Sequence, residues 1–211
     1  MDNEVQKELE NKLKNMDIVG FIDISWSMNE TDGGSVSRIK RAKEAFSELC
    51  SVAEKYDDDG LTMYLFNNNY TVKKNVTASM VPDIFKENPP TGGTKLGAVL
   101  EVAVADYFER KKTGKAKQGE IFLVLTDGEP SDKDKVFKTI VETSKQIDHD
   151  QEIGICFIQA GNDSEATAFL KELDDDLVSK HGAKHDIVDT IAVDKIGDRP
   201  LQEVLINALI D

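Results

Sequence analysis

The chain has 211 residues, of which 39% are hydrophobic, and its 26 basic and 40 acidic side chains leave a formal net charge of −14. This length and apolar content are typical of one globular domain and exclude a disordered acidic tail. The charge repels nucleic acid and anionic membranes, so we expect neither as a partner, and it favours the binding of cations. No apolar run reaches the length that crosses a bilayer.

Two features of the sequence bear on its compartment. The N-terminal residues lack the basic and apolar stretches of an export signal. Cys50 and Cys156 are the only cysteines and lie in apolar segments without metal-ligand spacing, which predicts buried, reduced thiols. We therefore expect a protein of the reducing cytoplasm.

The hydrophobic pattern alternates between short apolar runs, which predict strands, and longer segments with apolar residues at helical spacing. The first half predicts, in chain order, a polar helix over 2–15, a strand over 16–23, a helix over 36–56, a strand over 61–66, an edge strand over 70–73 and a helix over 78–88. The second half predicts a helix that follows Thr94 and extends through Tyr107, a strand over 119–126, a helix over 132–148, a strand over 153–159, a helix over 164–179, a strand within 186–193 and a helix over 198–210.

Strands that are apolar on both faces and joined by amphipathic helices indicate a parallel sheet with helices on each side. We predict an α/β fold: a doubly wound, mostly parallel, Rossmann-like sheet with right-handed crossovers and a short antiparallel edge strand over 70–73. No repeat or linker divides the chain. Residues 1–211 are therefore predicted to form one domain, with the helix of residues 1–15 packed on it.

Three loops that follow predicted strands or glycines carry oxygen-bearing side chains, and open α/β sheets bind ligands at the carboxyl ends of their strands. Asp23, Ser25 and Ser27 alternate after the first strand, so an extended or tightly turning backbone points all three the same way. Asp127 follows the most apolar strand, and Thr94 follows two glycines at the head of a helix. Two carboxylates and three hydroxyls suit Mg²⁺, Mn²⁺ or Ca²⁺.

Asp23-x-Ser25-x-Ser27, Thr94 in Thr-Gly-Gly-Thr and Asp127 in Leu-Thr-Asp-Gly together resemble the metal-ion-dependent adhesion site (MIDAS) of von Willebrand factor A and integrin I domains. The resemblance covers nearly the whole chain, including the order of strands and helices. It implies that Ser25 and Ser27 coordinate the ion directly, that Thr94 does so directly or through water, and that Asp23 and Asp127 act largely through bound waters. An ion held mainly by neutral hydroxyls keeps much of its Lewis acidity and accepts a partner's carboxylate.

Simpler interpretations of the same residues stay open at this point. The serine hydroxyls could satisfy backbone groups of their loop, Thr94 could be an N-cap, and Asp127-Gly128 could be an ordinary turn. Trp26 stands where the family has a small residue between the two serines. Trp26 and Met28 either form an apolar contact rim for a partner or are tucked against neighbouring loops.

The alternative function is a metal-dependent, phosphatase-like hydrolase that uses the same site. A haloacid-dehalogenase-like motif needs a carboxylate at position 25, which is Ser, and the P-loop order is absent from Gly92–Gly97. His149, His181 and His185 lie outside the site-forming loops, so no general base is evident other than Asp23 and Asp127, both of which are needed to hold the metal. A structural protein that has lost its metal is a third class, and the intact ligand residues argue against it.

We therefore predict that the chain is not an enzyme. We expect a MIDAS-type, Mg²⁺-dependent module, with Mn²⁺ or Ca²⁺ as alternative ions, that binds an Asp or Glu of a protein partner. It is expected to be a monomer when free. The resemblance to stand-alone domains of the family implies a cytoplasmic complex such as a stress-response, metal-resistance or chelatase-like system, and no residue chooses among these.

Overall fold

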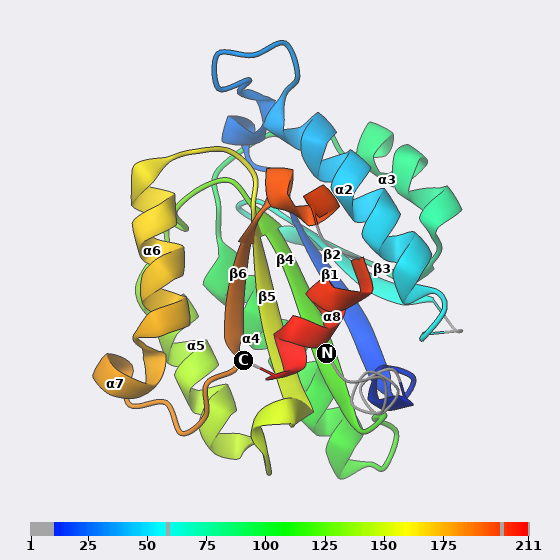
Figure 1. Cartoon of the computed structure of the whole chain (residues 1–211), viewed down its shortest axis with the longest axis vertical. Coiled ribbons are helices and arrows are strands. Elements are labelled where there is room, and N and C mark those ends of the chain that lie inside the picture. The colour runs from blue at the N-terminus through cyan, green and yellow to red at the C-terminus, as the bar shows by residue number, and fades with distance from the viewer. Residues whose placement is uncertain (1–10, 58–59, 199–200, 211) are drawn as a thin grey trace.

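The computed structural model describes residues 11–57, 60–198 and 201–210, and it has a central sheet with helices packed around it (Figure 1). The sheet has six strands in the order β3-β2-β1-β4-β5-β6. The strands are β1 (Met16–Asp23), β2 (Leu61–Phe66), β3 (Tyr70–Val76), β4 (Gly119–Thr126), β5 (Ile153–Gln159) and β6 (Val188–Ala192). All neighbouring strands are parallel except β2 and β3, which are antiparallel at one edge. The predicted doubly wound α/β architecture is confirmed.

Helices cover both faces of the sheet. They are η1 (Trp26–Asn29), α2 (Arg38–Ala53), η2 (Ala78–Met80), α3 (Val81–Glu87), α4 (Leu96–Lys112), α5 (Lys133–Gln146), η3 (Asp150–Glu152), α6 (Ser164–Asp175), α7 (Leu177–His181), η4 (Val193–Asp198) and α8 (Leu201–Ile210). One apolar cluster joins the sheet to α2, α3 and α8, and a second joins the other face to α4, α5, α6 and α7. Both clusters include residues of β1 and β4, which are therefore buried on both faces.

The two central strands owe their burial to their sequences. All eight residues of β4 are buried, and the apolar run over 121–125 predicts this for the middle five. On β1, a Cβ at Gly20 would lie 2.3 Å from the Phe46 ring of α2, so only glycine lets this helix pack so close to the sheet. The strand order changes direction between β1 and β4, since β2 lies on one side of β1 and β4 on the other. This switch point is where a doubly wound sheet leaves room for a ligand.

Several predicted elements differ from the structure at their ends. The helix expected over 36–56 begins at Arg38, because Ser37 has an extended backbone. The helix expected over 78–88 starts as a 3₁₀ turn and becomes α-helical at Val81, where Pro82 occupies a position in the first turn that needs no N–H donor. The helix expected over 164–179 breaks at Asp176 into α6 and α7.

The two ends of the chain are described only in part. Most of the helix expected over 2–15 lies outside the described residues; residues 11–13 are helical, and Leu13 is buried in the core. The strand expected over 70–73 extends to Val76. Of the helix expected over 198–210, Asp198 belongs to η4 and Leu201–Ile210 form α8. Residues 199–200, which fall within that expected helix, are outside the described ranges.

Both cysteines have the surroundings that the sequence predicts. Cys50 and Cys156 are buried and free. Burial raises the pKa of the Cys50 thiol to about 12, so this side chain is a neutral, inert part of the core.

In the part of the chain that the structure describes, no helix is both long and apolar enough to pass through a bilayer.

Candidate metal centre

The candidate site lies at the carboxyl ends of β1 and β4, which are neighbours in the sheet. Asp23 is the last residue of β1, and Asp127 follows Thr126, the last residue of β4. The Thr126 hydroxyl donates a hydrogen bond to Asp23 Oδ2 at 2.7 Å and so joins the two strand ends. Parallel pairing of β1 with β4 thus brings together two carboxylates that are 104 positions apart in the sequence.

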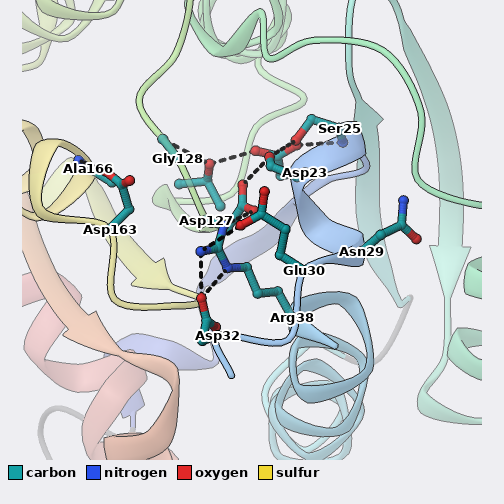
Figure 2. A network of polar contacts seen from close by, with 12 residues as sticks. Asp23, Ser25, Asn29, Glu30, Asp32, Arg38, Asp127, Gly128, Asp163 and Ala166 are labelled. Atoms are coloured by element: carbon teal, nitrogen blue, oxygen red, sulfur yellow. Dashed lines mark hydrogen bonds and ion pairs between the residues drawn. The ribbon is translucent and has the colours of Figure 1, made fainter. Parts of the chain in front are cut away.

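The loop after β1 turns the two serine hydroxyls towards Asp127. The Ser25 backbone N–H donates to Asp23 Oδ1 at 2.8 Å, and this bond tightens the turn into η1. The Ser25 and Ser27 hydroxyl oxygens are 3.0 Å apart, and Ser27 Oγ donates to Asp127 Oδ1, also at 3.0 Å. Figure 2 shows Asp23, Ser25 and Asp127 converging on this point. Four of the five predicted residues are therefore connected by hydrogen bonds.

Thr94 is held near the site by hydrogen bonds to its backbone carbonyl oxygen. Within the described residues, its hydroxyl group forms no hydrogen bond with the other four predicted residues. Thr94 is buried two positions before α4. Its carbonyl oxygen accepts hydrogen bonds from the Ser131 backbone N–H at 2.8 Å and the Ser131 hydroxyl at 2.9 Å. Ser131 follows Asp127 closely in the chain, so this pair of bonds holds the Thr94 loop against the Asp127 loop.

The interpretation of Thr94 as an N-cap is wrong. The N-cap residue of α4 is Lys95, and its side chain makes no capping bond. The carboxylate of Asp132 instead accepts hydrogen bonds from the Gly97 and Ala98 backbone N–H groups, at 3.1 and 2.9 Å. Asp132 therefore stabilises the start of α4 from another loop and leaves Thr94 free of that task.

The pKa of Asp23 is determined mainly by the burial of its carboxyl group. Its carboxyl group is fully buried, and burial, followed by the charge of Asp127, raises its pKa to about 7, against the lowering effect of hydrogen bonds from Ser25 and Thr126. Within the described residues, no Lys or Arg side chain forms a hydrogen bond or ion pair with Asp23. Burial also raises the pKa of Asp127, and a hydrogen bond from Arg38 opposes that rise. A nearby positive charge would relieve both carboxylates.

Arg38 is the site residue that sequence reasoning missed. It is the first residue of α2, and its Nη1 donates to Asp127 Oδ2 at 2.9 Å. Asp32, in the loop before α2, holds the same guanidinium group. The signal in the sequence was a cation in the first turn of a helix, where the helix dipole disfavours positive charge.

The donors fit a hard divalent cation. An octahedral Mg²⁺ with ligands at about 2.1 Å places neighbouring ligand oxygens about 3 Å apart, which is the spacing along Ser25, Ser27 and Asp127. No group of three or more His, Cys, Asp or Glu side chains among the described residues could hold a metal ion. The predicted site contains two carboxylates only, so an ion there would depend on the hydroxyls of Ser25, Ser27 and Thr94.

The two apolar residues of the site loop have opposite environments. Trp26 is 63% exposed, although its backbone N–H is anchored to the Gly92 carbonyl oxygen at 3.0 Å. Met28, two positions later, is fully buried in the core. The tucked interpretation is therefore wrong for Trp26 and holds for Met28.

The chain matches the family model of the von Willebrand factor type A domain over residues 17–185. Among solved structures it is similar to the VWA domain of SpRpn10, with a TM-score of 0.62 and 14% identity over 88% of this chain and 96% of that one. It is also similar to manganese-loaded TRAP protein of Plasmodium vivax, with a TM-score of 0.59 and 16% identity over 87% of this chain and 70% of that one.

A third similar structure is a mutant of the PilB minor pilin from Streptococcus sanguinis, with a TM-score of 0.61 and 14% identity over 93% of this chain and 63% of that one. No curated protein sequence matches the chain. At such low identities, the similarity to the solved structures establishes the fold alone.

Proposed function

Because the chain belongs to the von Willebrand factor type A family, whose members are generally interaction modules, we propose that it is a divalent-cation-dependent protein-binding domain. The observation that carries the proposal is the pair of buried carboxylates, Asp23 and Asp127, beside two serine hydroxyls at the carboxyl edge of the sheet. In the described part of the chain, the donors that bond to Asp23 are the neutral Ser25 N–H and Thr126 hydroxyl, so an added cation is favourable there.

Each residue has a role that follows from its position and from the family resemblance. Ser25, Ser27 and Thr94 would hold Mg²⁺ or Mn²⁺ through their hydroxyl oxygens. Asp23 and Asp127 would balance the charge and orient the bound waters. The ion would supply a Lewis acid with an exchangeable position, which suits the Asp or Glu of a partner protein. The manganese-loaded state of the TRAP protein supports the choice of ion by analogy.

The setting of this domain is part of the proposal. We place it in the cytoplasm, as a monomer when free, within an assembly such as a stress-response, metal-resistance or chelatase-like system. The net charge of −14 supports a partner surface that presents one carboxylate without being acidic overall, because two extended acidic surfaces repel one another.

No observation favours the alternative of a phosphatase-like hydrolase. In the described part of the chain, the titratable side chains that contact the site are Asp23, Asp127 and Arg38 with its acidic partners. His181, which stacks on Phe137 and contacts Glu172, belongs to α7 and lies on another element. Among the described residues, the candidate bases are thus the carboxylates assigned to the ion and those paired with Arg38, and no second function is proposed.

A thermal-shift series tests the metal site. Saturating Mg²⁺ or Mn²⁺ should raise the Tm of the chelator-treated protein by about 5–10 °C, because about 100-fold excess over Kd contributes about 2.7 kcal/mol to a domain of this size. Ser27→Ala removes one hydroxyl and should abolish most of this shift. Ser47→Ala is the matched control, because Ser47 is a half-buried serine on α2 whose hydroxyl donates to the Lys43 carbonyl within its own helix. Equal metal shifts in the two variants would rule out the assigned ligand.

Capture experiments test partner binding. The immobilised domain should retain a partner in Mg²⁺ and release it in chelator, and mass spectrometry would identify the eluate. Ser27→Ala provides the control bait, because it lacks one ligand and keeps the rest of the surface. A protein that elutes equally from both baits is not the proposed partner, and the absence of any metal-dependent protein would contradict the proposal.

A further inference from the structure

Arg38 occupies a position that two general rules disfavour. As the first residue of α2 it lies at the positive end of the helix dipole, where cations are destabilising. It is also only 7% exposed, and arginine is almost never buried unless it is paired. A residue that breaks two local rules is held by compensating contacts, and such places are often functional.

The compensation comes from three carboxylates (Figure 2). Arg38 Nη1 donates to Asp127 Oδ2 at 2.9 Å, while Nε and Nη2 donate to Asp32 Oδ1 at 2.9 and 2.6 Å. Glu30 Oε2 lies 3.3 Å from Nη2. The planar guanidinium group therefore bridges the loop before α2 and the loop after β4, which a single ammonium group could not do in the same way.

A third loop leaves space for this bridge. A Cβ at Gly161, between β5 and α6, would lie 2.6 Å from Arg38 Nε. Gly161 also has a φ of +108°, which L side chains rarely adopt. The sequence thus provides both the charge partners and the room for a buried guanidinium group at this point.

From this geometry we infer that Arg38 is a positioning residue for the metal centre: it binds Asp127 Oδ2 and so keeps Oδ1 turned towards the serine hydroxyls. The inference rests on the proposed function. Arg38 contacts the oxygen opposite the one that Ser27 contacts, so it supports the carboxylate from behind rather than taking the place of the ion. Hydrogen-bonded partners of ligating carboxylates tune metal sites in this way.

The local charges agree with this role. Asp23, Asp127, Asp32 and Glu30 provide up to four negative charges, and Arg38 with Arg41, which pairs with Asp32, provides two positive ones. With all four carboxylates ionised, the cluster has a deficit of two positive charges, which one divalent cation supplies. Arg38 therefore complements an ion and does not replace it.

Arg38→Met and Arg38→Lys, compared with Arg110→Met, test the inference. Arg110 is the matched control, because it also joins several carboxylates, at the opposite edge of the sheet. Isothermal titration with Mg²⁺ and with Mn²⁺ should give a Kd that is about 10–100-fold weaker for Arg38→Met, as is typical when a partner behind a metal ligand is lost. Arg38→Lys should fall between, since it keeps the charge but cannot bridge, and Arg110→Met should stay within about twofold.

Amide hydrogen exchange in EDTA gives a readout that does not need the ion. Arg38→Met should speed exchange in residues 24–34 and 127–132 while Arg110→Met leaves both segments unchanged. Unchanged metal binding by Arg38→Met would overturn the inference, because Arg38 would then not support the site. Tighter binding would also overturn it, because Arg38 would then compete with the ion. If the wild type itself binds neither ion, the proposed function fails, and with it the metal role of Arg38. Exchange would then decide only whether Arg38 orders the loops.

Discussion

Carboxylates are buried at both ends of the parallel strands, but their charges are neutralised differently. We call the end of the sheet where the parallel strands begin the amino edge, and the end where they finish the carboxyl edge. At the amino edge, a cavity of about 250 Å³ is lined by charged side chains that include Asp17, Asp57, Arg110, Lys117 and Glu120. Lys117 Nζ lies 2.6 Å from Asp57, and Arg110 pairs with Glu120. Burial opposes the charge on Lys117, yet hydrogen bonds and charges from Asp57 and Asp17 raise its pKa. Asp17, Asp57 and Glu120 therefore each contact a cationic side chain.

At the carboxyl edge, only one of the two buried carboxylates of the site bonds to a cationic side chain among the described residues. Asp127 has Arg38, whereas Asp23 has the Ser25 N–H and the Thr126 hydroxyl, and its pKa rises to about 7. The comparison teaches that buried acids alone do not indicate a metal centre, because most folds pair them internally. Two features distinguish the carboxyl edge: among the described residues no cationic side chain bonds to Asp23, and the Ser25 and Ser27 hydroxyls lie next to the carboxylates.

Matched Asp→Asn substitutions should have opposite effects at the two edges, and this is the largest difference that we predict. In EDTA at pH 8, Asp57→Asn should lower the free energy of unfolding by about 2–3 kcal/mol, because Lys117 loses its contact with the buried Asp57 carboxylate and keeps the contact with the more exposed Asp17. Asp23→Asn should raise it by on the order of 2 kcal/mol, because it removes a buried charge and keeps groups that can bond to Ser25 and Thr126. Urea unfolding measures both, and changes of the same sign would refute the comparison.

The pH dependence of stability should sharpen the same contrast. The folded protein binds the Asp23 proton more tightly than the unfolded chain, since the pKa is about 7 when folded and 3.8 otherwise. The Asp23 contribution is therefore fully present below about pH 4 and is lost as the pH rises to about 7, by at most on the order of 4 kcal/mol. The difference between wild-type and Asp23→Asn profiles in EDTA isolates it from other acids. Mg²⁺ should flatten that difference, and parallel profiles without metal would contradict the assignment.

Periodicity was enough to predict the sheet and the loops of the site. Strands such as β4 are apolar at nearly every position, so their ends and the residues that follow them could be located from sequence. Asp23, Ser25, Ser27 and Asp127 come together because Asp23 ends β1, the two serines lie in the loop that follows it, and Asp127 directly follows β4. The ends of helices were less predictable, because the breaks at Val81 and Asp176 depend on local backbone geometry inside an unbroken apolar pattern.

The supporting contacts could not be predicted, because their partners are distant in the sequence. Arg38 meets a carboxylate 89 positions away, and Asp132 caps a helix that begins 36 positions earlier in the chain. Neither pairing follows a repeat or a motif, and each depends on how two loops fold against one another. The backbone of Trp26 likewise bonds to a distant loop, because its N–H donates to the Gly92 carbonyl oxygen.

Trp26→Ala should have the smallest effect on the fold and a clear effect on binding. Its side chain is largely exposed, so its loss should change the free energy of unfolding by less than about 0.5 kcal/mol. We expect a partner that delivers a carboxylate to Ser25 and Ser27 to contact the exposed Trp26 side chain, because Trp26 lies between them in the sequence. A central aromatic contact is typically worth about 2 kcal/mol, or about 30-fold in Kd. Titration of the captured partner in Mg²⁺ measures this loss.

Met80→Ala is the control for that measurement, because Met80 is an exposed apolar residue, 43% accessible, that follows β3 at the amino edge of the sheet. It should leave partner affinity unchanged. If Trp26→Ala binds the partner as tightly as the wild type, the contact surface does not include the loop between the two serines. If Met80→Ala weakens binding as much, the partner contacts both edges, and the carboxyl edge has no special part in recognition.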